Sequence, residues 1–215
     1  MTTDRTTQTR WVQENVQTWT DEHLVRWYSK WSREWAGFVA QTTPPLVEQL
    51  GIAAGQRVLD LASGPGEPAI TIARMVGPTG QVTATDLSAG MLECAAANAR
   101  EAGVTNLVTQ VAPADDLPFP DGAFDRVTCR FGVMYFPDVR KALSEARRVL
   151  VPGGQAGFAV WPPDDEHPYA DHLALFARYF PSPEPEPGQP ASDRFSDGES
   201  LGEELRAAGF VDVIV

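Results

Sequence analysis

The sequence has little cysteine, a deficit of positive charge and no long apolar run. Its two cysteines, Cys94 and Cys129, lack CxxC spacing, so we expect both to be reduced, buried and inert. Seventeen basic against 29 acidic residues give a formal net charge of −12, which disfavours nucleic-acid and anionic-membrane partners. No segment reaches the roughly 20 apolar residues of a membrane-spanning helix, and the polar N-terminus lacks a signal-peptide core. We therefore expect a cytoplasmic protein without membrane insertion.

What the sequence does contain is typical of a folded α/β domain. Hydrophobic residues make up 43% and charged residues 21% of its 215 residues, which excludes disorder of the whole chain. From residue 56 onward, short apolar segments alternate with helical patterns, which predicts βαβ units and a parallel sheet covered on both faces. The fold class is therefore a Rossmann-like, doubly wound, mostly parallel sheet. The predicted strands are 57–61, 81–85, 107–111, 124–130, 155–161 and 210–215.

The predicted helices follow from periodicity and capping residues. A helix follows the first strand from Ala69, Ser88 caps one that runs to residue 103, and Asp138 starts another. Residues 170–180 and 200–209 are further predicted helices, and the Pro- and acid-rich residues 181–188 are expected to be extended.

The first 50 residues have a different character from the rest and are expected to form an N-terminal helical arm or lid. Residues 1–15 are predicted to be a frayed arm. Between residues 21 and 40, aromatic and apolar side chains recur at steps of four, three, four and three, which predicts one helical face. This helix either packs on the domain or covers a pocket. The members of the face are Leu24, Tyr28, Trp31, Trp35 and Phe38. Residues 51–215 form the second predicted unit, with 162–198 as a variable insertion on the substrate side.

A glycine-rich turn after the first strand predicts a nucleoside cofactor. Gly64 and Gly66 allow a close approach to the backbone, and Asp86, about 20 residues on, is placed to accept ribose hydroxyls. These residues suit either a dinucleotide or S-adenosylmethionine. Asp60 and Glu67 beside the turn would oppose a pyrophosphate but suit a cofactor with a sulfonium and an ammonium group. The alternative role of Glu67 is stabilisation of the helix N-terminus.

Four blocks occur in one order along the chain, at residues 58–66, 84–92, 114–125 and 150–154. In these blocks the sequence resembles class I S-adenosylmethionine-dependent methyltransferases, especially the type 11 group of quinone-biosynthesis methyltransferases. The resemblance covers about residues 45–215. Two positions depart from the family pattern, because Ala62 stands where the family has its first motif glycine and Pro113 where it often has Asp. Ala62 is expected to narrow the space beside the methionine moiety.

The resemblance implies which residues bind the cofactor. Asp86 would bind the ribose and Met91 would pack on the adenine, while Asp115 and the backbone of Ala114 would lie beside the adenine amino group. Arg130 begins the segment after the fourth strand, which is expected to face the transferable methyl group. The full set of predicted cofactor-binding residues is Asp60, Ala62, Gly64, Gly66, Asp86, Leu87, Met91, Ala114, Asp115 and Arg130.

The predicted activity is methyl transfer from S-adenosylmethionine, with S-adenosylhomocysteine as product, to a small, largely apolar acceptor. An aromatic, quinol-like, polyketide or lipid-like acceptor is favoured by the aromatic helix. Such a transfer needs alignment more than acid–base chemistry, so the catalytic residues stay unassigned, with Tyr135 and His167 as weak candidates. No His, Asp or Glu spacing predicts a metal site. An NAD(P)-dependent oxidoreductase and a non-catalytic cofactor-binding domain are the alternatives.

The end of the sequence raises a separate expectation. Proteins of the resembled family finish their sheet with a seventh, antiparallel strand, whereas this chain ends at Val215 within the predicted sixth strand. The seventh strand is therefore expected to be missing. The chain is then a fragment, which we favour, or strand six lies directly beside strand five, or a second copy pairs with the exposed edge to form a homo-dimer.

Overall fold

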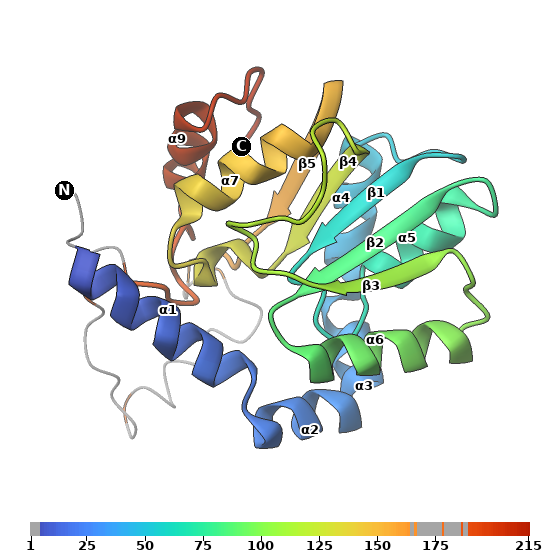
Figure 1. Cartoon of the computed structure of the whole chain (residues 1–215), viewed down its shortest axis with the longest axis horizontal. Coiled ribbons are helices and arrows are strands. Elements are labelled where there is room, and N and C mark those ends of the chain that lie inside the picture. The colour runs from blue at the N-terminus through green and yellow to red at the C-terminus, as the bar shows by residue number, and fades with distance from the viewer. Residues whose placement is uncertain (1–4, 164–165, 167–177, 179–185, 187–188) are drawn as a thin grey trace.

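The computed structural model describes residues 5–163, 166, 178, 186 and 189–215, and a five-stranded sheet forms its centre (Figure 1). The strands lie in the order β3-β2-β1-β4-β5, and every neighbouring pair is parallel. The predicted Rossmann-like sheet is therefore confirmed, and three strands have the predicted bounds. The strands are β1 (Arg57–Leu61), β2 (Gln81–Asp86), β3 (Leu107–Val111), β4 (Phe124–Arg130) and β5 (Leu150–Ala159).

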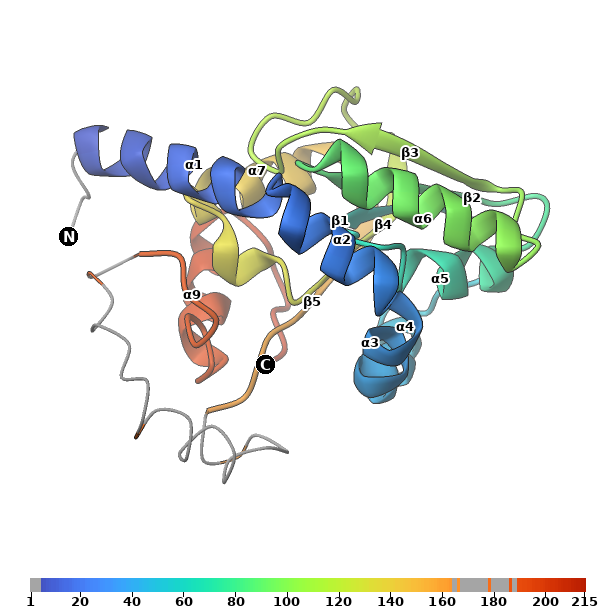
Figure 2. The same ribbon diagram turned by 90° about the horizontal axis from the view of Figure 1, so that it is seen from below.

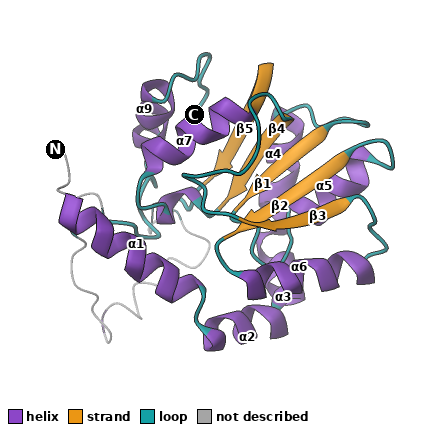
Figure 3. Ribbon diagram, in the orientation of Figure 1, coloured by secondary structure: helices purple, strands orange, loops and turns teal. Residues whose placement is uncertain are grey.

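Helices cover both faces of the sheet, as the doubly wound fold requires. Helices α4 (Thr43–Gln49) and α5 (Ala69–Val76) lie behind the sheet in Figure 1, and α7 (Val139–Val149) lies in front of it. Figure 2 shows the same separation from below. Helix α6 (Ala89–Glu101) packs beside β2 and β3, and α9 (Glu199–Ala207) packs on α7 (Figure 3).

The predicted helix starts at Ser88 and Asp138 are confirmed by their caps. The Ser88 hydroxyl accepts from the Met91 N–H at 3.4 Å, and the Asp138 carboxylate accepts from the Lys141 N–H at 3.0 Å. Both contacts satisfy an N–H group that the first turn of a helix leaves without a partner inside the helix.

Two apolar clusters hold the layers together, one on each face. Because side chains alternate along a strand, Val58 of β1 joins the cluster with α4, α5 and α6, while Leu59 and Leu61 join the cluster with α7 and α9. Cys94 and Cys129 are buried and free, as predicted. Burial raises the pKa of the Cys129 thiol, so this group is not a nucleophile.

The N-terminal prediction is partly wrong. Residues expected to fray form α1 (Arg5–Trp19), in which the Trp11 side chain is 3% exposed. The Asn15 amide donates to the backbone oxygen of Tyr135 at 2.6 Å, in a short 3-10 helix, η2 (Val133–Tyr135). Contacts with residues distant in the sequence thus stabilise α1 although its own pattern is weakly amphipathic.

The aromatic face predicted as one helix is divided in two. Helix α2 (Glu22–Lys30) begins at an Asp21 cap and ends at Trp31, where α3 (Ser32–Val39) starts in a new direction. A 3-10 turn, η1 (Ala40–Thr42), leads into α4, whose first turn holds the two prolines. The change at Trp31 follows from its non-helical backbone, with φ −109° and ψ 17°.

The prediction of a sixth strand at residues 210–215 is wrong. This segment has no strand backbone, and its Ile214 side chain is 90% exposed. A Cβ at Gly198 or Gly202 would lie within 3.0 Å of the Val215 side chain, so the segment runs beside the start of α9 instead of along β5. An apolar run becomes a strand only where a sheet edge lies beside it, and here α9 takes that place.

Other predictions cannot be compared with the structure. The helix expected at 170–180 and the extended connection at 181–188 lie outside the described residues, apart from residues 178 and 186. In the part of the chain that is described, no helix has the length and apolar character needed to span a membrane.

Candidate active site

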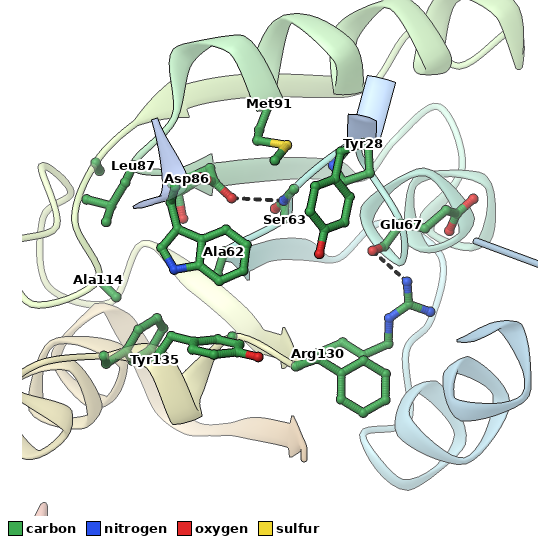
Figure 4. Close-up of a pocket in the computed structure, with 18 of the residues that line it drawn as sticks. Tyr28, Ala62, Ser63, Glu67, Asp86, Leu87, Met91, Ala114, Arg130 and Tyr135 are labelled. Carbon is green, nitrogen blue, oxygen red and sulfur yellow. Dashed lines mark hydrogen bonds between the residues drawn. The ribbon is translucent and has the colours of Figure 1, made fainter. Parts of the chain in front are cut away.

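A cavity of about 800 Å³ lies at the carboxyl ends of the parallel strands (Figure 4). Its floor is formed by the segments that follow β1, β2, β3 and β4, the position at which Rossmann-like sheets bind ligands. Helices α1, α2 and α3 form the opposite wall through side chains that include Asn15, Trp19, Tyr28 and Trp35. The N-terminal helices are therefore part of the cavity and do more than pack on the domain.

Asp86 lies at the end of β2, beside the glycine-rich turn. Its carboxylate accepts from the Gly64 N–H at 2.9 Å and from the Ser88 N–H at 2.9 Å. Burial raises the pKa of Asp86, and these two N–H groups, together with that of Leu87, oppose the shift by stabilising the charged form. A carboxylate has about four lone-pair positions, so acceptor capacity remains for a hydroxyl group in the cavity.

The two glycines of the turn have different roles. Gly64 has φ +51°, and a Cβ there would meet no atom within 4 Å, so its backbone is open on the cavity side. Gly66 does not line the cavity, and a Cβ there would lie 2.9 Å from Ile70 Cδ1 and 3.1 Å from Ala95 Cα. Gly66 therefore allows the turn to pack closely on α5 and α6, whereas Gly64 leaves space for a ligand.

Ala62 lines the cavity in an unusual backbone conformation. Its φ is +52°, in the left-handed region that costs an L residue about 1 kcal/mol or more. A Cβ at Gly132, in the segment after β4, would lie 2.5 Å from Ala62 Cβ and 3.0 Å from Cys129 Sγ. The methyl group of Ala62 therefore occupies the space that Gly132 leaves.

Asp60 is completely buried and lies outside the cavity lining. One oxygen, Oδ1, accepts from the Thr128 hydroxyl at 2.6 Å, whereas Oδ2 has no hydrogen-bond partner within the described part of the chain. Burial raises the pKa of Asp60 from 3.8 to about 6, although the Thr128 hydrogen bond and the charge of Arg130 oppose the shift. Asp60 therefore lies beneath the glycine-rich turn and does not contact the cavity directly.

Arg130 connects the N-terminal helices to the glycine-rich turn. Its guanidinium donates to the backbone oxygen of Glu67 at 2.8 Å (Figure 4). It also donates to the Thr43 hydroxyl at 2.8 Å and to the backbone oxygen of Val39 at 3.4 Å. The Glu67 carboxylate accepts from the Thr71 N–H at 3.3 Å, near the start of α5. Glu67 thus has the helix-stabilising role that the sequence left open.

Three residues predicted to lie beside the adenine, Met91, Ala114 and Asp115, line one end of the cavity with Leu87. Met91 comes from the first turn of α6 and Leu87 lies just before that helix, whereas Ala114 and Asp115 come from the loop after β3. The Asp115 carboxylate pairs with Lys141 Nζ at 3.6 Å. This pairing makes Asp115 an ordered part of the wall.

The wall opposite this end is aromatic. Trp19 packs against the Tyr135 ring at a centroid distance of 5.0 Å, and Phe131 stacks on Trp161 at 3.8 Å. Trp31 of the predicted aromatic face and the neighbouring Trp27 are exposed outside the cavity. The aromatic side chains in the lining are Trp19, Tyr28, Trp35, Phe131, Tyr135, Phe136 and Trp161.

The cavity brings together most of the predicted cofactor residues, and only Asp60 and Gly66 of that set do not line it. Tyr135, a catalytic candidate, also lines it, whereas His167 lies outside the described residues. The sequence reading missed Trp19, and it recognised Tyr28 only as part of the aromatic face. The described residues contain no group of three His, Cys, Asp or Glu side chains that could hold a metal ion. The predicted residues that line the cavity are Ala62, Gly64, Asp86, Leu87, Met91, Ala114, Asp115 and Arg130.

The model of the ubiE/COQ5 methyltransferase family matches residues 32–160, which is more than half of the chain. The chain belongs to this family. The resemblance seen in the four sequence blocks is thereby confirmed, and with it the class of S-adenosylmethionine-dependent methyltransferases. The match begins after α1 and α2, so these two helices lie outside it.

Curated relatives agree with the family. Proteins named ubiquinone/menaquinone biosynthesis C-methyltransferase UbiE are 44% identical over 110 residues in Psychromonas ingrahamii and 45% identical over 106 residues in Serratia proteamaculans. These alignments cover 51% and 49% of this chain, and 44% and 42% of the relatives. The chain therefore spans less than half the length of these relatives.

Solved structures share the fold. A SAM-dependent methyltransferase from Aquifex aeolicus superimposes with a TM-score of 0.60 at 23% identity, covering 77% of each chain. The [4+2]-cyclase SpnF superimposes with a TM-score of 0.62 at 29% identity, covering 79% of this chain and 57% of its own.

Proposed function

We propose that this protein binds S-adenosylmethionine in the cavity and transfers its methyl group to a small aromatic acceptor of the quinol type. The observation that carries the proposal is that one cavity joins a nucleoside-binding floor to an aromatic wall. Its volume of about 800 Å³ lies in the upper part of the range of small-molecule sites, about 300–1,000 Å³. The names of the relatives, which refer to ubiquinone and menaquinone biosynthesis, support the acceptor class.

The floor fits the cofactor at each of its parts. The remaining acceptor capacity of Asp86 suits a ribose hydroxyl, and Leu87 and Met91 offer apolar surface to the adenine. The free space at Gly64 lets the backbone approach the methionine moiety. The guanidinium of Arg130 has five N–H donors, of which protein oxygens take three, so it is placed to hold a carboxylate.

The bound cofactor would supply an activated methyl group on a sulfonium sulfur. The acceptor attacks the methyl carbon in line, and the sulfur leaves as a neutral thioether. The chain then has to orient the acceptor and exclude water, because the leaving group needs no protonation. Burial, with a further contribution from the nearby Tyr28, raises the pKa of Tyr135 to about 12. Tyr135 therefore stays protonated near neutral pH and serves as a hydrogen-bond donor, not as a general base.

A turnover assay with a panel of acceptors tests this function. The protein is incubated with S-adenosylmethionine and a reduced quinol, a catechol, a fatty acid or a primary amine, and S-adenosylhomocysteine is measured. Formation of S-adenosylhomocysteine with the quinol above the no-acceptor rate is expected. Binding of S-adenosylhomocysteine without turnover on any acceptor would support a non-catalytic cofactor-binding domain instead. The family match disfavours the NAD(P)-dependent oxidoreductase.

The remaining organisation belongs to the same proposal. Residues 1–50 act as a lid over the cavity, and residues 51–215 form the cofactor-binding domain. The variable insertion predicted at 162–198 lies mostly outside the described residues. The two cysteines are free and buried, which favours a cytoplasmic location for the protein. Association of two copies is proposed through β5, because no strand in the described residues pairs with its outer edge.

A further inference from the structure

Two tyrosine hydroxyls face the same part of the cavity from opposite walls. Tyr28 comes from α2, and Tyr135 comes from η2 beyond the end of β4; Figure 4 shows the two rings directed into one space. Neither hydroxyl has a hydrogen-bond partner among the described residues, although both rings are partly buried. Neither hydroxyl is among the fully buried, unpaired polar atoms of the described residues, so both open onto the cavity and are available to a polar atom of a ligand.

The packing of the rings fixes where these hydroxyls lie. Tyr28 meets Trp27 edge-on at 5.1 Å and Trp35 edge-on at 5.9 Å, while Trp19 lies 6.4 Å from Tyr28 and 5.0 Å from Tyr135. Trp19 is thus a common neighbour of both rings. Aromatic contacts of this geometry hold the rings without using their hydroxyl groups, so both hydroxyls are positioned in advance and still available.

The position of Tyr28 depends on how α2 packs against α6. A Cβ at Gly90 would lie 2.7 Å from Val25 Cγ1, so the glycine allows α2 to lie close to the start of α6. The start of α6 follows Asp86 closely in the sequence. Burial is the main cause of the raised pKa of Tyr28, and the charge of the Asp86 carboxylate is the second. Tyr28 therefore lies between the ribose end of the cavity and the aromatic wall.

We propose that Tyr28 is a positioning residue for the acceptor. Together with Tyr135, Tyr28 holds one oxygen atom of the acceptor, whose aromatic ring is bound against Trp19. This inference rests on the proposed function. Both hydroxyls are protonated near neutral pH, as tyrosine hydroxyls ordinarily are, and burial raises their pKa values further, so each can donate to a hydroxyl, carbonyl or phenolate oxygen. Tyr28 lies outside the family match, which begins at residue 32, so this contact belongs to the chain's own N-terminal segment.

A binding comparison tests the proposal without requiring turnover. The full chain, saturated with S-adenosylhomocysteine, is titrated with 1-naphthol and with naphthalene, which differ by one hydroxyl group. The wild type is expected to bind 1-naphthol about tenfold more tightly, the effect of roughly one net hydrogen bond. Tyr28→Phe and Tyr135→Phe should each reduce this preference to about threefold or less, with naphthalene affinity unchanged. Trp31→Phe, whose exposed ring lies at the end of the same helix outside the cavity, is the matched control and should keep the preference.

The outcomes separate the proposal from the function on which it rests. Equal affinity of the wild type for 1-naphthol and naphthalene would overturn the role of the tyrosine pair. The same conclusion follows if Tyr28→Phe keeps the preference, or if it weakens S-adenosylhomocysteine binding, since Tyr28 would then serve the cofactor. Failure of the wild type to bind S-adenosylhomocysteine contradicts the proposed function itself and is measured first, in a separate titration.

Discussion

Asp60 is a carboxyl group whose surroundings favour its neutral form. It lies under the glycine-rich turn with one oxygen on Thr128 and the other without a partner among the described residues. Its pKa of about 6 exceeds the usual value of 3.8, so between these pH values the folded state binds a proton that the unfolded state releases. The free energy of unfolding must therefore fall as the pH rises toward and through 6.

The Asp60→Asn variant measures this contribution. The difference in unfolding free energy between wild type and variant should change by about 1.4 kcal/mol between pH 5 and pH 7.5, with the wild type relatively weaker at the higher pH. Urea denaturation of both proteins at the two pH values gives this difference. A difference that stays constant with pH would contradict the raised pKa.

Ala62 and Gly132 fill one small space between them. A methyl group added at Gly132 would lie 2.5 Å from the one on Ala62, so Gly132→Ala should destabilise the protein by about 1–3 kcal/mol. Ala62→Gly removes the opposing methyl group and should recover part of that loss, because it also suits the left-handed backbone. Thermal unfolding of both single variants and the double variant gives the coupling. Additive effects would show that the two positions do not share this space.

At the scale of secondary-structure elements, α1 and α2 serve the cavity more than the core. Neither apolar cluster of the Rossmann-like sheet includes a residue before Val47 among its fully buried members. The cavity, by contrast, is lined from α1 and α2 by Trp19 and Tyr28 among others. These two helices are expected to matter for the acceptor and little for folding of the sheet.

Deletion of residues 1–31 tests that division. The remaining chain should fold and bind S-adenosylhomocysteine within about fivefold of wild type, because the cofactor floor and the contacts of Arg130 with Val39 and Thr43 remain. Quinol turnover should fall at least about tenfold, since one wall of the cavity is lost. The variant Trp31→Ser, which alters an exposed ring of these helices outside the cavity, is the control. Unchanged turnover in the deletion would show that α1 and α2 only pack on the surface.

The elements that the sequence predicts well are those with a strong local pattern. Strands such as Arg57–Leu61 are short buried runs between turn residues, and Ser88 and Asp138 cap their helices through contacts within three residues. Helix α1 and residues 210–215 were predicted wrongly because their structure depends on neighbours distant in the sequence, Tyr135 and α9.

The residues of the candidate site also fall into those that the sequence predicts and those that it does not. The roles of Gly64 and Asp86 follow from their positions after parallel strands, and the structure brings them within one hydrogen bond. The hydrogen bond of Asp60 could not be predicted from its neighbours in the sequence, because Thr128 reaches it from β4. The hydroxyl of Tyr28 enters the cavity because α2 packs on Gly90, and no sequence motif predicts that contact.

At the scale of the whole molecule, β5 is one of the two edge strands of the sheet in the described residues, and β3 is the other. An edge strand offers unpaired backbone groups to a second copy, and a net charge of −12 opposes such association. We expect a dimer that strengthens at 0.5 M salt as the repulsion is screened. Sedimentation equilibrium at low and high salt measures this, and a monomer under both conditions would contradict the proposed association.

The central claim is that the cavity binds S-adenosylmethionine with its ribose on Asp86. Calorimetric titration of S-adenosylhomocysteine into wild type and Asp86→Ala is the most direct test, with NAD titrated into the wild type as the competing nucleotide. The wild type should bind one S-adenosylhomocysteine per chain and no NAD. The variant should lose about 2–4 kcal/mol of binding free energy, because the ribose loses a charged acceptor. Equal affinity of wild type and variant for S-adenosylhomocysteine would contradict the account.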